Sequence, residues 1–120
     1  MRVIIAAFAM ASAASLAGTA AAHAFLERAT PRVGSRIAAA PSEVRLWFSE
    51  PVEPAFCIVV VRGPPGFGGT EPAHVAEGDR RILVAPLRQP VPAGRYVVQW
   101  RVVSVDSHVT QGDFQFELRP

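Results

Sequence analysis

The stretch Arg95–His108, RYVVQWRVVSVDSH, contains the longest strand that the sequence predicts and ends in two side chains that can bind a metal ion. Residues 95–103 are rich in Val, Tyr and Trp, which favour strands. We therefore place residues 95–103 at the centre of a β-sheet. Asp106 and His108 follow this strand, two positions apart. In an extended chain such side chains leave the same face, so a carboxylate oxygen and an imidazole nitrogen would converge on one ion.

Further short strands are expected on both sides of this stretch. Alternating apolar and polar residues predict half-buried strands at Glu43–Glu50 and Asp113–Leu118. The continuous apolar run Ala55–Val61 is typical of a buried strand, and two shorter strands are predicted at His23–Arg28 and Arg81–Ala85. No segment shows a helical stripe, and the connections are short and rich in Pro and Gly. The sequence therefore predicts a small all-β sandwich or barrel with antiparallel pairing.

The first 22 residues have the pattern of an export signal. Arg2 provides a basic start, Val3–Leu16 an apolar centre, and Ala20–Ala22 the small residues that a signal peptidase recognises. The apolar centre is shorter than the ~20 residues of a membrane span. We therefore predict that residues 1–22 are a cleaved signal peptide rather than a membrane anchor.

The position of the cut decides whether His23 is kept. Cleavage after Ala22 leaves residues 23–120, which are enough for one domain, with His23 as the first residue. Cleavage after Ala24 also fits the pattern of small residues and would discard His23. We expect the cut to follow Ala22.

Composition excludes several classes of protein. Without Arg2 the chain carries 11 Arg against 10 Asp and Glu, with no Lys and no basic stripe, so no nucleic-acid partner is expected. The single Cys57 excludes an internal disulfide. Its apolar surroundings favour an inert buried thiol over a metal thiolate. Hydrophobic packing must therefore stabilise the domain.

A chain that begins with His23 has two nitrogen donors on one residue, the α-amine and the imidazole. Both lose their protons near neutral pH, the amine with a reference pKa of about 7.7 to 8, and together they chelate one ion. The imidazole of His108 and an oxygen of Asp106 would complete a set of donors that Cu(II) or Ni(II) prefers. Met1 and Met10 are the only methionines and lie in the predicted signal, so no thioether cluster remains for Cu(I). The site should therefore favour Cu(II).

Each of these residues also has a simpler interpretation. An Asp-x-His sequence at a strand end is more often a solvated turn than a metal site, and a histidine near a cleavage site is weak evidence alone. Metal binding is favoured because two of the three histidines, His23 and His108, occupy these special positions. The third, His74, follows a glycine-rich loop, and we predict it to be a solvent-exposed loop residue.

Six motifs along the predicted mature chain occur together. They are HAFL at 23–26, Thr-Pro at 30–31, LWFSEPVE at 46–53, GRYVVQW at 94–100, VSVDSH at 103–108 and GDFQF at 112–116. In this order they resemble the CopC proteins, which are periplasmic copper-resistance and copper-homeostasis proteins. The resemblance covers almost the whole mature chain. An Asp-x-His motif after a Trp-bearing strand, combined with an N-terminal His, is fairly specific.

The resemblance implies an immunoglobulin-like, Greek-key β-barrel of the cupredoxin-like type. It also implies a Cu(II) site formed by Asp106, His108 and the amine and imidazole of His23. Glu50 would accept a hydrogen bond from the N-terminal amine, which would orient that ligand. Some family members carry a second, Met-rich Cu(I) site, and this sequence lacks it.

We therefore predict an exported, periplasmic Cu(II)-binding protein, not an enzyme, that takes part in copper sequestration, delivery or resistance. We expect a monomer, and any inner-membrane copper transporter that acts with it would be a separate chain. One alternative is a copper mono-oxygenase, which also uses an N-terminal His, but Asp106 would occupy a position that oxygen chemistry needs open. Another is a metal-free immunoglobulin-like binding module, in which His23 and Asp106 have no metal-binding role.

Overall fold

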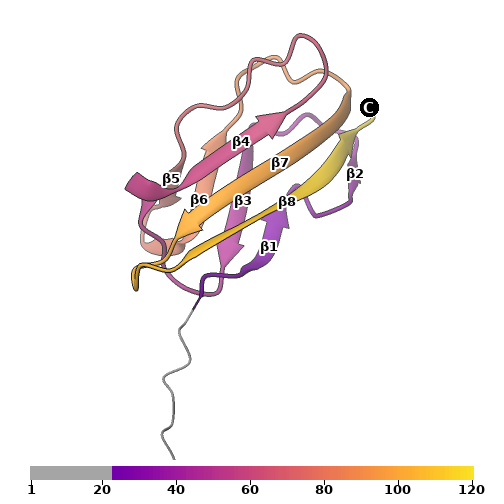
Figure 1. Ribbon diagram of the computed structural model, residues 1–120. Helices are drawn as coiled ribbons and strands as arrows, with labels where there is room; N and C mark the ends of the chain where they lie inside the picture. Colours follow the sequence, from indigo (N-terminus) through magenta and orange to yellow (C-terminus); the bar gives the residue numbers. More distant parts are fainter. Residues whose placement is uncertain (1–22) are drawn as a thin grey trace, which may run out of the picture.

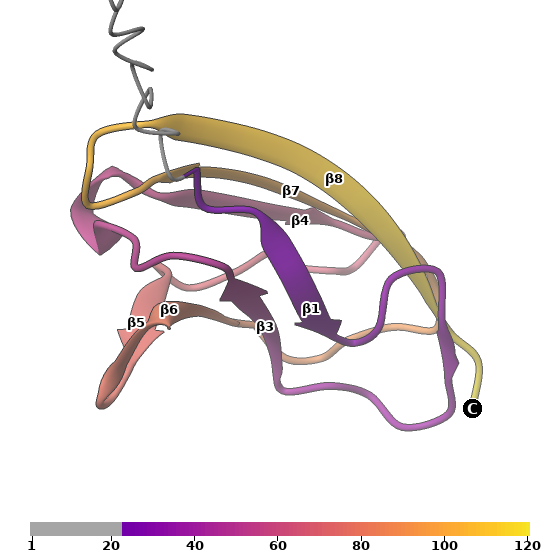
Figure 2. The same cartoon turned by 90° about the horizontal axis from the view of Figure 1, so that it is seen from below.

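The computed structural model describes residues 23–120, which fold into two four-stranded sheets packed face to face (Figures 1 and 2). The predicted signal peptide, residues 1–22, lies outside the described residues and stays a prediction. The elements are β1 (Leu26–Thr30), β2 (Arg36–Ile37), β3 (Glu43–Phe48), the 3-10 helix η1 (Pro54–Phe56), β4 (Ile58–Arg62), β5 (His74–Ala76), β6 (Asp79–Pro86), β7 (Gly94–Val103) and β8 (Val109–Leu118).

The strand order confirms the predicted all-β sandwich. One sheet has the order β1-β3-β6-β5 and the other β2-β8-β7-β4. The chain passes from one sheet to the other five times, between β1 and β2, β2 and β3, β3 and β4, β4 and β5, and β6 and β7. Connections that cross between sheets in this way are found in Greek-key sandwiches. All pairs are antiparallel except β2 with β8, which is parallel. Among residues 23–120 no helix is long and apolar enough to span a membrane.

Alternation along the strands produces the core between the sheets. Every second residue of β3 is buried, and the same is true of the last half of β8. Tyr96 of β7 is fully buried and stacks on Phe116 of β8 with ring centroids 5.0 Å apart. The predicted half-burial of β3 and β8 is thereby confirmed, and their inward residues are Val44, Leu46, Phe48, Phe114, Phe116 and Leu118.

The hairpin of β7 and β8 sets the position of the Asp-x-His motif. The two strands pair over ten residues, from Gly94 opposite Leu118 to Val103 opposite Val109. Trp100 packs edge-on against Phe48 and lies across Gly112, where a Cβ atom would come within 2.6 Å of the indole. Only glycine leaves room for the ring at that position. Residues 104–108 form the turn of this hairpin. They follow the part of β7 in which Trp100 packs against Phe48 and Gly112.

Several predictions of where strands begin and end differ from the structure. The first strand begins at Leu26 rather than His23, because residues 23–25 bind side chains of other segments. The last strand begins at Val109, earlier than the predicted Asp113, because the β7–β8 turn is tight and pairing starts directly after it. His74 is exposed as predicted, but it begins β5 opposite Val84 rather than lying in a loop.

The apolar run Ala55–Val61 is not a fully buried strand. It divides into η1 and β4, and Ile58 and Val60 are exposed because nothing in the described chain covers the outer face of this sheet. Cys57 lies between the two elements and is half-buried. Its Sγ donates a hydrogen bond to the carbonyl oxygen of Glu53 at 3.1 Å, and burial raises the pKa of the thiol. A thiol kept protonated in this way fits the predicted inert role.

Candidate metal centre

The segment that carries His23 is fixed at the end of the sandwich by two hydroxyl groups. Ser49 Oγ donates to the carbonyl oxygen of His23 at 3.0 Å and accepts the backbone N–H of Phe25 at 2.8 Å. Thr110 Oγ1, from the start of β8, donates to the carbonyl oxygen of Ala24 at 2.6 Å. Ala24 is fully buried. His23 is therefore held beside β8 although it belongs to no strand.

The Asp-x-His motif lies in a turn and not in an extended strand, so the geometric reason given for its convergence was wrong. Strand β7 ends at Val103, and Ser107 has a φ of 71°, in the left-handed region. The backbone closes the turn with hydrogen bonds from Ser104 N–H to His108 O and from Ser107 N–H to Ser104 O, both 2.9 Å long. Asp106 and His108 still come together, because the turn folds them over Ser104.

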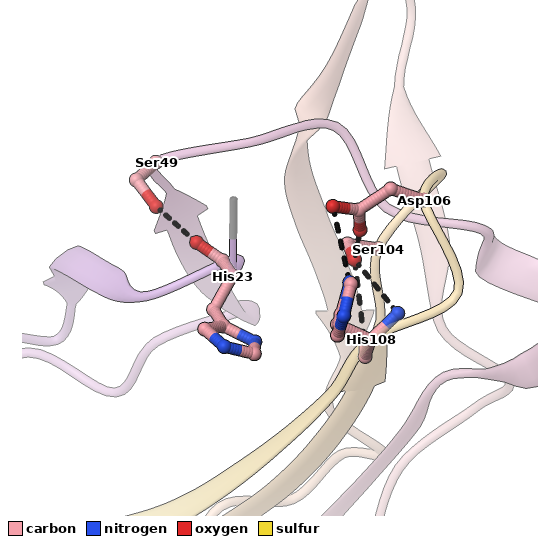
Figure 3. A network of polar contacts seen from close by, with 5 residues as sticks. All are labelled: His23, Ser49, Ser104, Asp106 and His108. Carbon is pink, nitrogen blue, oxygen red and sulfur yellow. Dashed lines mark hydrogen bonds and ion pairs between the residues drawn. The ribbon is translucent and has the colours of Figure 1, made fainter. Parts of the chain in front are cut away.

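The imidazoles of His23 and His108 face each other at this end of the molecule (Figure 3). Their ring centroids are 4.7 Å apart and the rings are nearly perpendicular, at 83°. Nδ1 of each ring is buried and has no hydrogen-bond partner within residues 23–120. A buried nitrogen without a partner is costly, and a bound cation would supply that partner. The two histidines thus have the environment of metal ligands.

Asp106 and His108 form a pair of donor atoms that fits one ion. Oδ2 of Asp106 lies 3.1 Å from Nδ1 of His108, which is an ion-pair contact when the imidazole is protonated, and no hydrogen bond joins these two atoms. Metal–ligand bonds of about 2.1 Å at right angles place two donor atoms about 3.0 Å apart. The observed separation therefore matches two adjacent ligands of a tetragonal ion such as Cu(II).

The carboxyl group of Asp106 is kept ionised by its neighbours. The hydrogen bond from Ser104 Oγ is the largest cause that holds the pKa of Asp106 below its ordinary value, and the contacts with His108 lower it further. A carboxylate in this state is an available anionic ligand at neutral pH. The side chains of Asp106 and His108 are 38% and 41% exposed, so both reach solvent although Nδ1 of His108 is itself buried.

The structure brings the three predicted ligands together in pairs but not as one closed group. Across residues 23–120, no three His, Cys, Asp or Glu side chains are arranged to hold an ion by themselves. His108 contacts both partners, whereas His23 and Asp106 have no direct contact in the described chain. A fourth predicted donor, the α-amine of His23, is a peptide nitrogen before cleavage. The prediction therefore needs the amine to complete the set.

Glu50, the predicted acceptor for the amine, and His74, the predicted exposed histidine, make no contact with this centre in residues 23–120. Glu50 is half-buried beside Ser49, and its carboxylate makes no hydrogen bond or ion pair within residues 23–120. The amine that it was predicted to bind does not exist in the uncleaved chain, so its role stays a prediction. His74 lies on β5, in the opposite sheet from β7 and β8.

Three residues that build the centre, Ser49, Ser104 and Thr110, were not predicted from the sequence. Their hydroxyl groups hold the segments that carry the predicted ligands. Serine and threonine are common at strand ends and in turns, so composition gave no signal for Ser49 or Thr110. Ser104 could have been noticed because it lies two residues before Asp106, where a hydroxyl can bind a turn carboxylate.

Comparison with known proteins gives consistent matches. A family model described as the CopC domain matches residues 26–119. Protein YobA of Escherichia coli K12 is 38% identical over 99 residues, which cover 82% of this chain and 80% of that protein. Copper resistance protein C of Escherichia coli is 35% identical over 111 residues, 87% of each chain. The crystal structure of CopC from Methylosinus trichosporium OB3b superposes with a TM-score of 0.73 at 31% identity, covering 82% of this chain and 95% of that one.

Proposed function

The chain belongs to the CopC family and so has a copper-related function, and we propose that it binds one Cu(II) ion through His23, Asp106 and His108. The ligand atoms would be the α-amine and imidazole of His23, an imidazole nitrogen of His108 and a carboxylate oxygen of Asp106. Such a set of nitrogens with one carboxylate suits the tetragonal preference of Cu(II). The residues between 23 and 120 include no methionine, which disfavours Cu(I).

The observation that carries this proposal is a pair of buried Nδ1 atoms, on two facing imidazoles, that have no hydrogen-bond partner in the part of the chain that the structure describes. Nδ1 of an N-terminal histidine closes a six-membered chelate ring with the α-amine, so the orphaned atom of His23 is the one that chelation needs. Nδ1 of His108 lies beside the Asp106 carboxylate at the spacing of adjacent ligands. Both His23 and the pair of Asp106 and His108 therefore support the proposed copper ion.

We further propose that the protein acts in the periplasm, where it sequesters copper, delivers it or confers resistance to it. The predicted signal peptide and a mature N-terminus at His23 support this location, because the amine becomes a ligand only after cleavage. A monomer with a separate membrane copper transporter as its partner is the expected arrangement. Binding rather than catalysis is proposed because the Asp106 carboxylate would fill a coordination position that oxygen activation requires.

Copper titration of the mature chain tests this function. Residues 23–120 with a free amine at His23 should bind one equivalent of Cu(II), measured by isothermal titration against a competing chelator and by electron paramagnetic resonance (EPR). The spectrum should be that of a tetragonal site with nitrogen donors. No binding, or binding that is unaffected when both His23 and His108 are replaced by alanine, would contradict the proposal and favour the metal-free module.

A further inference from the structure

We infer that Ser104 is a positioning residue whose buried hydroxyl holds Asp106 and His108 ready for copper. The inference rests on the proposed copper site. Ser104 is 1% exposed and is the one buried polar residue among residues 23–120. It is too deeply buried to bind an ion from solvent itself. A buried hydroxyl must have partners, and both of its partners belong to the predicted ligand residues.

The contacts of the hydroxyl group identify what it does. Ser104 Oγ donates to Oδ1 of Asp106 and accepts the backbone N–H of His108 at 3.2 Å (Figure 3). The carbonyl oxygen of His108 is also 3.2 Å away, but a hydroxyl has one proton. The charged carboxylate is the stronger acceptor, so the proton goes to Asp106. One atom thereby connects the side chain of Asp106 to the backbone of His108.

This arrangement assigns separate roles to the two oxygens of Asp106. Oδ1 is used by the hydrogen bond from Ser104, which leaves Oδ2 facing Nδ1 of His108 at 3.1 Å. Without the hydroxyl, the carboxylate would turn freely about its last torsion, because this torsion is broad and roughly two-fold. Oδ2 of Asp106 and Nδ1 of His108 would then no longer be held at the separation that fits an ion.

Ser104 is itself held by the segment that also holds His23. It forms an isolated bridge with Val52, and the next residue, Val105, donates its N–H to the carbonyl oxygen of Pro51 at 3.1 Å. Three residues earlier along the same segment, Ser49 binds the carbonyl oxygen of His23. Residues 49–52 therefore fix both halves of the centre relative to each other, and Ser104 transmits this placement to the two ligands on the turn.

The experiment compares variants of the mature chain, residues 23–120, by Cu(II) affinity and by EPR. Ser104→Ala should weaken binding by about 10- to 100-fold, the usual cost of removing a group that orients a metal ligand, and should change the EPR spectrum. Ser104→Thr keeps the hydroxyl and should restore most of the affinity. The matched control is Ser35→Ala, which removes a hydroxyl that donates to Arg32 O in a turn at the opposite end and should change neither quantity.

A double-mutant cycle separates positioning from a general loss of structure. In an Asp106→Ala background, Ser104→Ala should cost clearly less affinity than in the wild-type background, because one of its two targets is gone. Equal losses in both backgrounds, or wild-type affinity and spectrum for Ser104→Ala, would overturn the inference. If Ser104→Ala does not fold by circular dichroism, Ser104→Gly replaces it in the same cycle. A wild-type chain that binds no copper would instead overturn the proposed function, and the inference with it.

Discussion

His74 and the facing pair His23 and His108 are the same type of residue in two different environments. His74 is exposed on the edge strand β5, where it lies opposite Val84 of β6. The other two lie where β1 begins and β7 turns into β8, with buried Nδ1 atoms that have no hydrogen-bond partner within residues 23–120. What distinguishes the two proposed ligands is a buried ring nitrogen beside other donor atoms. The residue type alone does not distinguish them.

The two regions also differ in whether their imidazole nitrogens have a hydrogen-bond partner. The side chain of His74 needs no partner because water supplies one. The facing imidazoles of His23 and His108 instead have buried Nδ1 atoms without a hydrogen bond within residues 23–120. Three hydroxyl groups hold the segments that carry these residues. Sites that bind ligands are often kept in arrangements that the fold alone would not favour.

Acidification should have the largest effect on the proposed binding of copper by His23 and His108. Imidazoles and α-amines in general take up protons below about pH 6.5 and pH 8, and protons then compete with Cu(II) for these donors. All copper should be released between pH 7 and pH 4, measured by EPR of the bound ion. The carboxylate of Asp106 is not the cause, because its lowered pKa keeps it ionised until the pH falls below its ordinary range. Full occupancy at pH 4 would contradict the nitrogen-rich site.

Replacing His108 and His74 in turn tests directly whether the two histidines differ in copper binding. His108→Ala should lower Cu(II) affinity by more than the ~100-fold that loss of an outer partner costs, because it removes the donor that contacts both other ligands. His74→Ala is the matched control and should bind as the wild type does. Thermal unfolding of both apo variants should stay close to wild type, because neither side chain lies in the core. Equal affinities for the two variants would remove His108 from the site.

Moving the N-terminus tests the chelate while every side chain is kept. One alanine added before His23 turns the α-amine of that residue into a peptide nitrogen and places the new amine one residue away. Affinity should fall by roughly 10- to 100-fold, a smaller loss than for His108→Ala, because both imidazoles remain. The control is an alanine added after Pro120, at the C-terminus. Unchanged affinity in the N-terminal variant would show that the amine is not a ligand.

The smallest effect is expected for Glu50. If it orients the amine after cleavage, Glu50→Gln should weaken binding less than tenfold, because an amide oxygen can still accept a hydrogen bond. Glu77→Gln, a change on an exposed side chain, serves as the control. An effect of Glu50→Gln no larger than that of the control would remove Glu50 from the centre.

Much of the fold could be predicted because it depends on alternation. The buried positions of β3 and β8 and the length of β7 follow from the sequence pattern. The run before Val61 was misjudged because a continuous apolar sequence does not tell whether a sheet face is covered. The parallel pairing of β2 was missed since two residues carry no periodic signal.

The candidate centre could be predicted only in part. Asp106 and His108 were found by their spacing, yet they meet through a turn that a positive φ at Ser107 closes. That conformation is unusual for a residue with a side chain, so it could not be predicted from the residue type at position 107. Ser49 and Thr110 act over separations of 26 and 86 residues, and such contacts exist only once the sheets have packed.

The most direct test of the copper centre is the native mass of the exported protein, purified from periplasm and measured with and without one equivalent of Cu(II). We predict a chain that begins at His23 and gains the mass of one copper ion. A chain that begins at Phe25, a chain that still carries residues 1–22, or a chain from His23 that takes up no copper would contradict the account.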